Sequence, residues 1–397
     1  MFFVKFIISV ALLLVHDSQA DYFDDYIKWL QASSVKPDVH ANPSPTAFRD
    51  SCETPDKREG RCVRPSECNQ IEEKIDPTTL FDIRSGSCHY LRPCCPYELI
   101  RENEREPERE EPTTLGCGWT NPGANMFRSG QTYNHVADFG EFRWMVALLK
   151  ITSDSGVWRN PDDYIGGGSL IHPSVVLTVA HYAADKTPDM IKCRAGEWDT
   201  RTVDEVEPHQ DREVRKIKVH PEYISAKLYN DAALLVLKEP FNLYNAPHIG
   251  VGCLGYTMPP PNTICYSMGW GKEEFKGREY ANILKKVQLP LVSKDQCETA
   301  FKRTLNSDSP VHNSWICAGG VKGSDTCTGD GGSSLVCPIQ CDGEPRRYAI
   351  YGMVAFGVGC GDSLPAGYVN IPHVYNWIVR SMRDEALNET SFVPEQH

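Results

Sequence analysis

The sequence predicts a mainly β protein with a C-terminal helix, preceded by a small disulfide-rich module. From about residue 115 onward, short apolar and β-branched runs alternate with Gly, Pro and Asn turns, as in all-β barrels and sandwiches. Apolar residues then recur at helical spacing over Tyr375–Ala386, where Trp377, Ile378 and Met382 are expected to face the body. Six cysteines crowd into residues 52–95. The clearest β runs are Met145–Leu149, Ser174–Thr178, Ala232–Leu237 and Tyr351–Ala355.

The first 20 residues have the pattern of a cleaved secretory signal, which predicts a secreted, extracellular protein. A lysine is followed by the apolar stretch Phe6–Val15 and then by small residues before Asp21. The stretch is too short to span a bilayer comfortably. A buried N-terminal helix is the less favoured alternative. Residues 21–51 are polar, with Pro and Ser, and are expected to be poorly ordered.

The cysteines predict disulfides, because the extracellular space is oxidising and the count of 16 is even. Residues 52–95 are too few to fold firmly on a hydrophobic core alone, so this unit needs cross-links. A zinc site is the competing interpretation, but the two Cys-x-x-Cys pairs typical of zinc sites are missing. Spacing alone leaves all 15 pairings of six cysteines open.

Residues 96–129 are predicted to be a linker. The segment RENEREPEREEP (101–112) is highly charged, lacks an apolar period and contains two prolines. It is either a plain spacer or a protease-sensitive segment with trypsin-type cleavage sites at Arg101, Arg105 and Arg109.

A net charge of -12 argues against a nucleic-acid partner, which would require a basic face. No segment after the signal is apolar and long enough to be a membrane span. Asn388-Glu-Thr is an acceptor triplet for N-glycosylation if it is exposed.

Three segments resemble the His, Asp and Ser motifs of the chymotrypsin-like serine proteases, in the order found in that family. They are LTVAH (177–181), NDAALL (230–235) and CTGDGGSSL (327–335). The resemblance covers roughly residues 130–385 and implies a chymotrypsin-like double β-barrel, followed by a C-terminal tail at 386–397. It also implies that His181 is the base and Asp231 the carboxylate that orients it.

The nucleophile position of that motif is occupied by Gly331, which has no side chain to acylate. Loss of the nucleophile typically lowers turnover by about six orders of magnitude, because the triad acts as a unit. Ser333 and Ser334 lie too far along the chain to replace it, since a nucleophile misplaced by ~1 Å already reacts far more slowly. We therefore expect a protein that is not an enzyme.

Other positions fit this interpretation. No Arg or Lys directly precedes Gln131–Asn134, the segment that corresponds to the activation site, so the cleavage switch of such enzymes is expected to be absent. A disulfide frequent in the family is replaced by Tyr182 and Gly166. Gly329 keeps one oxyanion-hole position. The expected specificity pocket consists of Asp325 at its base, Gly357, and Ala366 in place of the usual glycine.

The front module resembles the clip domain that precedes protease domains in arthropod blood proteins. This resemblance implies the pairs Cys52–Cys94, Cys62–Cys88 and Cys68–Cys95 in residues 52–95. In the rear domain it implies Cys265–Cys337, Cys297–Cys317 and Cys327–Cys360, and Cys117 is expected to pair with Cys253. The two remaining cysteines, Cys193 and Cys341, are then expected to pair with each other.

One metal hypothesis comes from a loop that resembles the calcium-binding loop of trypsin-like proteins. Its oxygen ligands would be Glu197, Asp199 and Glu207, since hard oxygen donors suit calcium. A solvated acidic loop is the equally weighted alternative. No other cofactor is expected.

The whole architecture resembles the clip-domain serine protease homologues, some of which are cofactors of melanisation. That resemblance implies a non-catalytic cofactor or scaffold, activated by cleavage in the linker, with a clip-domain serine protease, prophenoloxidase and other protease homologues as partners. The alternatives are a negative regulator or decoy that uses the Asp325 pocket, a protein that recognises microbial surfaces, and a hydrolase with an unconventional nucleophile.

Overall fold

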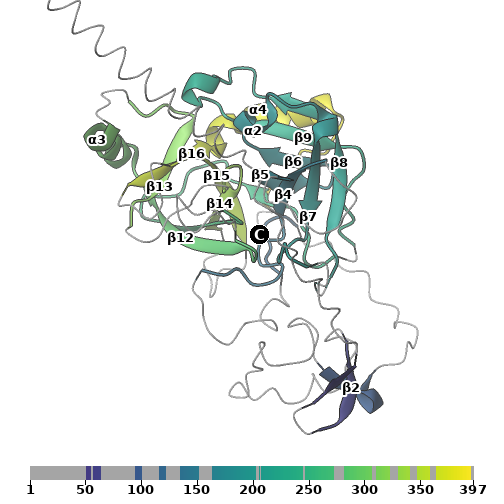
Figure 1. Ribbon diagram of the computed structural model, residues 1–397. Helices are drawn as coiled ribbons and strands as arrows, with labels where there is room; N and C mark the ends of the chain where they lie inside the picture. The colour runs from purple at the N-terminus through teal and green to yellow at the C-terminus, as the bar shows by residue number, and fades with distance from the viewer. Residues whose placement is uncertain are drawn as a thin grey trace, which may run out of the picture. The chain divides into compact units, whose positions relative to one another are not determined.

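The computed structural model describes most of the protease-like body and the strands of the front module (Figure 1). The described residues are 51–54, 57–63, 94–100, 116–121, 135–151, 163–202, 205, 207–244, 246–271, 281–305, 310–321, 330–339, 347–357 and 364–394. The predicted signal, the polar segment up to residue 50 and the stretch from Arg101 to Arg109 lie outside them. No helix among the described residues is long and apolar enough to cross a membrane.

The first half of the body is a closed antiparallel barrel with the strand order β4-β5-β6-β9-β8-β7. Its strands are β4 (Met145–Lys150), β5 (Tyr164–His172), β6 (Val175–Thr178), β7 (Ile191–Ala195), β8 (Gln210–Val219) and β9 (Ala233–Leu237). Strands β6 and β9 are buried along their whole length, as their continuous apolar runs predict. They coincide with the predicted runs near residues 174–178 and 232–237.

The second half is a ring of six strands in the order β15-β14-β11-β12-β13-β16, closed by the pairing of β15 with β16. The short strand β10 (Cys253–Leu254) pairs in parallel with β15 outside the ring. The ring strands are β11 (Ile264–Gly269), β12 (Lys285–Val292), β13 (Trp315–Gly319), β14 (Ser334–Pro338), β15 (Tyr348–Phe356) and β16 (Pro365–Asn370). The expected chymotrypsin-like double barrel is therefore confirmed.

One apolar cluster runs through both barrels. Trp144, immediately before β4, is fully buried, and its indole Nε1 donates to Ser334 Oγ on β14 at 3.1 Å. Trp270, immediately after β11, is also fully buried and donates to the carbonyl of Trp198 at 3.2 Å. The two indole N–H groups thus find buried acceptors, and each tryptophan ties one barrel to the other.

The C-terminal helix α4 (Ile371–Asp384) starts four residues earlier than its apolar pattern predicts. Asn370 caps it by accepting from the His373 amide, and Pro372 fits the first turn because that turn needs no N–H from it. Trp377, Ile378 and Met382 are buried, as expected. Helix α4 packs against β15 and β10, whereas α3 (Lys294–Leu305) lies beside β13 (Figure 1). The short helix α2 (Ala180–Ala183) follows β6.

The front module contains a three-stranded antiparallel sheet of β1 (Ser51–Glu53), β2 (Glu59–Cys62) and β3 (Cys94–Pro96). The disulfide Cys52–Cys94 joins the outer strands. Cys62 and Cys95 are also disulfide-bonded. Their expected partners, Cys88 and Cys68, lie outside the described residues, as do both cysteines of the expected pair Cys327–Cys360.

Three disulfides lie within the described part of the body, and all three match expected pairs: Cys117–Cys253, Cys265–Cys337 and Cys297–Cys317. The expected pair Cys193–Cys341 is wrong, because Cys193 is a free thiol, fully buried in the first-barrel core. Cys193 lies on β7 between β4 and β8, where it serves as a small apolar side chain. Cys341 lies outside the described residues.

Candidate functional site

His181 and Asp231 form a hydrogen-bonded pair at the edge of the first barrel. His181 Nδ1 lies 2.6 Å from Asp231 Oδ2, and the His181 backbone N–H donates to Asp231 Oδ1 at 2.8 Å. The Asp231 side chain is fully buried, whereas the His181 side chain is 22% exposed. A carboxylate can only accept hydrogen bonds, so this contact places the imidazole proton on Nδ1.

Local backbone features place both side chains. Val179 is extended after β6, and the chain then turns into α2, which contains His181. Asn230, directly before Asp231, has a left-handed φ of 51°, a conformation that asparagine tolerates better than most residues. Its N–H donates to Ser314 Oγ, and its side-chain amide donates to the Glu222 carbonyl, both at 3.0 Å. These contacts fix the turn that directs Asp231 inward.

Gly331 lies in a turn at the start of β14, and the backbone of this turn is held by both barrels. The Gly331 carbonyl accepts from the Gly167 N–H of β5 at 2.8 Å, and the Gly332 N–H donates to the Val354 carbonyl of β15 at 2.9 Å. Gly332 has a φ of +81°, which favours glycine, and a Cβ there would overlap the Gly167 carbonyl. The turn is therefore fixed from two sides.

The Tyr182 ring lies against Gly331. A Cβ at residue 331 would be 2.5 Å from Tyr182 Oη and 2.8 Å from its Cε2 and Cζ. The same ring occupies the space that a side chain at Gly166 would need. It also contacts the His181 imidazole, with the ring centroids 4.3 Å apart.

Neither neighbouring serine is available as a nucleophile. Ser333 and Ser334 are both fully buried. Ser334 Oγ accepts from Trp144 and contacts Met268 Sδ at 3.2 Å. The expectation that they do not replace the missing hydroxyl agrees with this burial.

Asp330, directly before Gly331, is held by the backbone of the second barrel. Its Oδ1 accepts from the Gly271 N–H at 2.9 Å. A Cβ at Gly269 or Gly271 would overlap its carboxylate, so the two glycines leave room for Asp330. The predicted activation segment Gln131–Asn134 lies outside the described residues.

The described part of the expected specificity pocket consists of Ala366 and Gly357. Ala366 lies on β16 opposite Ala318 and is 1% exposed, within the apolar cluster of the second barrel. Gly357 is exposed directly after β15. Asp325 and Gly329 lie outside the described residues, so the pocket base and the oxyanion position stay predictions.

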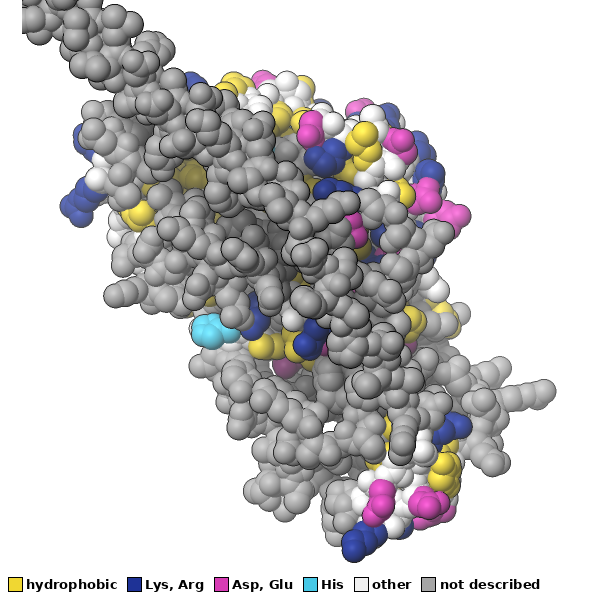
Figure 2. Space-filling model, viewed as in Figure 1, with side chains coloured by type: hydrophobic (Ala, Val, Ile, Leu, Met, Phe, Trp, Pro, Cys, Tyr) yellow, Lys and Arg dark blue, Asp and Glu magenta, His cyan; other side chains and the backbone are white. Residues whose placement is uncertain are grey.

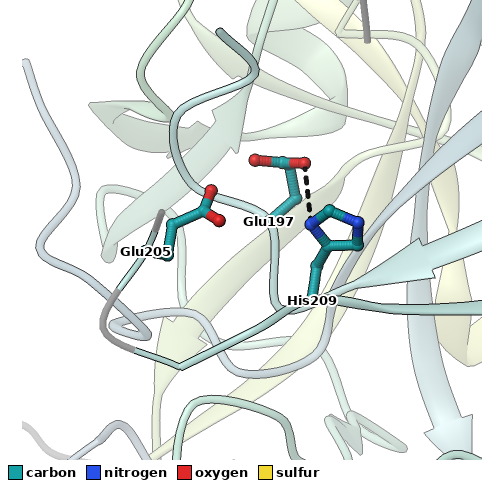
Figure 3. A group of neighbouring side chains, drawn as sticks. All are labelled: Glu197, Glu205 and His209. Atoms are coloured by element: carbon teal, nitrogen blue, oxygen red, sulfur yellow. Dashed lines mark ion pairs between the residues drawn. The ribbon is translucent and has the colours of Figure 1, made fainter. Parts of the chain in front are cut away.

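The predicted calcium ligands Glu197, Asp199 and Glu207 do not form one group. Figure 3 shows Glu197 beside Glu205 and His209 instead, with ligand atoms all within 4.8 Å of one another. The Asp199 carboxylate accepts from the Arg201 guanidinium at 3.2 Å.

This group does not fit calcium. Arg194 Nη1 donates to Glu197 Oε2 at 3.2 Å, so a buried guanidinium already holds one carboxylate. His209 offers an imidazole nitrogen, whereas calcium takes oxygen ligands. Burial, together with the nearby Glu197 carboxylate, raises the pKa of Glu205 well above its usual range. A raised pKa favours the protonated, neutral form of Glu205, which lowers the repulsion between the two buried acids.

Asn388 is exposed, as glycosylation of its triplet requires. Its side-chain oxygen accepts from the Thr390 hydroxyl at 2.8 Å.

Figure 2 shows acidic and basic side chains side by side over β8 and the end of α4. Glu385, directly after α4, pairs with Arg215 and Lys216 of β8.

The sequence did not lead us to predict that the Tyr182 ring lies against Gly331. Nor did it lead us to predict that Glu205 and His209 lie beside Glu197. A sequence signal existed for the first, because Tyr182 directly follows the motif histidine at a position where a cysteine is usual. For the second, the signal was a histidine within an acidic loop.

Comparison with known proteins gives a consistent result. The family model described as trypsin matches residues 132–378. "Phenoloxidase-activating factor 2" of Galleria mellonella is 43% identical over 300 residues, covering 72% of this chain and 95% of that protein. "Inactive CLIP domain-containing serine protease A8" of Anopheles gambiae is 38% identical over 305 residues, covering 73% and 77%. A second mosquito protein, "Inactive CLIP domain-containing serine protease A28", is 34% identical over 337 residues, covering 79% and 85%.

The double barrel and the His181–Asp231 pair agree with the trypsin match, and several relatives carry the word inactive in their names. The names of these relatives support a protein without protease activity. The chain belongs to the trypsin family, as a clip-domain serine protease homologue.

Proposed function

We propose that this chain is a secreted, non-catalytic cofactor in the extracellular protease cascade that activates prophenoloxidase and leads to melanisation. The carrying observation is that Gly331, which has no side-chain nucleophile, lies against Tyr182, whose ring contacts His181 of the retained His181–Asp231 pair. The family mechanism forms an acyl-enzyme on a hydroxyl at this position and cannot run without it. Relatives named phenoloxidase-activating factors support the choice of cascade.

The switch in this proposal is a cut within the linker at Arg101, Arg105 or Arg109. These residues lie between β3 of the clip sheet and Cys117, which is tied to the body through Cys253. The described clip disulfide, Cys52–Cys94, is internal to the clip. A cut in the linker would therefore leave both folded parts cross-linked internally while severing the chain between them.

The partners follow from this role. A clip-domain serine protease would cut the linker, and the cleaved chain would then act with prophenoloxidase, alone or with other protease homologues. No catalytic cofactor is required, because the role is to bind and present partners.

The test combines purified prophenoloxidase with a clip-domain serine protease and either the intact or the linker-cut chain, and it measures phenoloxidase activity. We expect an immediate rise with the chain cut beforehand and, with the intact chain, a delayed rise that follows cleavage of its linker by the added protease. The matched control replaces all three arginines by glutamine, which removes the cleavage sites and should abolish the rise. His181→Ala at equal folded concentration should retain it, since no proton transfer is involved.

Other outcomes point elsewhere. An unchanged activity would contradict the cofactor role. A fall that disappears in Asp325→Ala would favour the decoy, and binding of the uncut chain to microbial wall material would favour surface recognition. If His181→Ala abolished the rise while the protein stayed folded, the non-catalytic premise would be wrong.

A further inference from the structure

The space over Gly331 is already occupied by a neighbouring side chain. Any side chain at residue 331 would begin with a Cβ only 2.5 Å from Tyr182 Oη and 2.8 Å from two ring carbons. Carbon atoms without a bond between them lie about 3.5–4.0 Å apart at their optimum. A serine hydroxyl at this position would therefore collide with the ring before it could approach His181.

The backbone cannot retreat to make room. The Gly331 carbonyl is hydrogen-bonded to Gly167 on one side, and the next residue is bonded to Val354 on the other. Gly167 itself is fixed, because its carbonyl accepts from the buried Thr178 hydroxyl at 2.8 Å. Both barrels thus hold the turn in place under the Tyr182 ring.

Three positions share this one volume. The ring fills the space of a side chain at Gly166 and that of a side chain at Gly331, and glycine is the residue at both. Its centroid also lies 4.3 Å from that of the His181 ring, so the same side chain contacts the retained imidazole. A bulky residue at 182 and glycines at 166 and 331 are mutually compatible, whereas a side chain at either glycine would force the tyrosine ring out of its position.

We propose that Tyr182 is a plug that fills the former nucleophile site, so that this protein is blocked twice, by the missing hydroxyl and by the occupied space. The inference goes beyond the cofactor role and does not depend on it. One consequence is that Gly331→Ser alone does not rebuild a reactive centre.

The experiment is a double-mutant cycle between residues 331 and 182. Gly331→Ser is made in the native background, with Tyr182→Ala, and with Tyr182→Phe, and the thermal unfolding midpoint of each full-length protein is measured. Overpacking of this kind lowers Tm by about 2 to 10 °C in a domain of this size. We expect this drop when Gly331→Ser is made in the native background. In the Tyr182→Ala background the same substitution should lower Tm by less than half as much. In the Tyr182→Phe background the drop should stay nearly as large as in the native one, because the phenylalanine ring still overlaps the Cβ.

Two further arms keep the test decisive. If Tyr182→Ala does not fold, Tyr182→Leu replaces it, since leucine still covers Gly166 but ends short of the positions of Oη and Cζ. Each folded serine variant is also incubated with a fluorophosphonate, whose phosphorus would bond to the serine Oγ as fluoride leaves and the hydroxyl proton passes to His181. Gly331→Ser alone should stay unlabelled. An equal Tm drop in all backgrounds, no drop at all, or labelling of that single variant would overturn the plug.

Discussion

Asp231→Asn tests whether the retained His181–Asp231 pair is now a structural element. The buried Asp231 carboxylate accepts two hydrogen bonds, one from the His181 backbone and one from the imidazole. Asparagine can still accept from the backbone N–H, and its amide nitrogen can donate to His181 Nδ1 once the imidazole proton moves to Nε2. Both bonds then lose the carboxylate charge, and hydrogen bonds to charged groups contribute about 1.5–3 kcal/mol against about 0.5–1.5 kcal/mol for neutral ones. We therefore expect a loss of about 2–3 kcal/mol in the free energy of unfolding.

The measurement is urea denaturation of the full chain, with unfolding monitored by tryptophan fluorescence. Asp384→Asn is the matched control, because that carboxylate is 70% exposed and its ion pair with Lys218 lies at the surface. Exposed pairs of this kind contribute about 0–1 kcal/mol. At a temperature where Asp231→Asn is fully folded, its effect on prophenoloxidase activation should equal that of the native chain.

Two results would refute this reasoning. A stability loss as small as that of the surface control would mean that the two hydrogen bonds carry no structural weight. A folded Asp231→Asn protein without any cofactor effect would mean that the pair takes part in function, which a non-catalytic role does not explain.

Three further predictions follow from individual contacts. Hydrogen bonds from Lys216 and neighbouring cations lower the pKa of Glu385 to about 2, so its stabilising effect is present above about pH 4.5 and is lost as the pH falls toward 2. Glu385→Gln should therefore be less stable than the native chain at pH 7, and the gap between their denaturation midpoints should shrink by pH 3. Burial raises the pKa of the Cys193 thiol, so a maleimide should label it only under unfolding conditions, and rapid labelling of the native protein would contradict its burial. Replacing both Cys117 and Cys253 by serine should lower stability by about 2–5 kcal/mol in a denaturant titration, because that bridge spans 136 residues, and an unchanged midpoint would count against it.

Much of the fold is predictable from local pattern. Strands β6 and β9 are continuous apolar runs, and the buried face of α4 follows helical spacing, so their types could be read directly. Strand β8 gives a weaker signal, because its sequence QDREVRKIKV is rich in charges. It is a strand because it pairs with β7 on one side and β9 on the other, and no local pattern contains that information.

The site was predictable in part for a similar reason. His181, Asp231 and Gly331 lie in ordered motifs, and motif order alone places them together. The position of the Tyr182 ring depends on how β5 and the turn before β14 approach each other across the two barrels. The error at Cys193 has the same origin, since counting cysteines cannot tell a buried thiol from half of a disulfide.

The division between retained and lost parts of the former catalytic centre follows from what each part contributes to folding. Asp231 binds the His181 backbone N–H at the start of α2, where helix N–H groups lack partners within the helix, so removing it would leave a buried donor unsatisfied. A nucleophile hydroxyl at residue 331 would serve only chemistry. Its absence removes no hydrogen bond that the fold needs, and the Tyr182 ring packs into the space next to Gly331 and Gly166. A chain can therefore keep the histidine and aspartate of a protease and still be closed to protease chemistry.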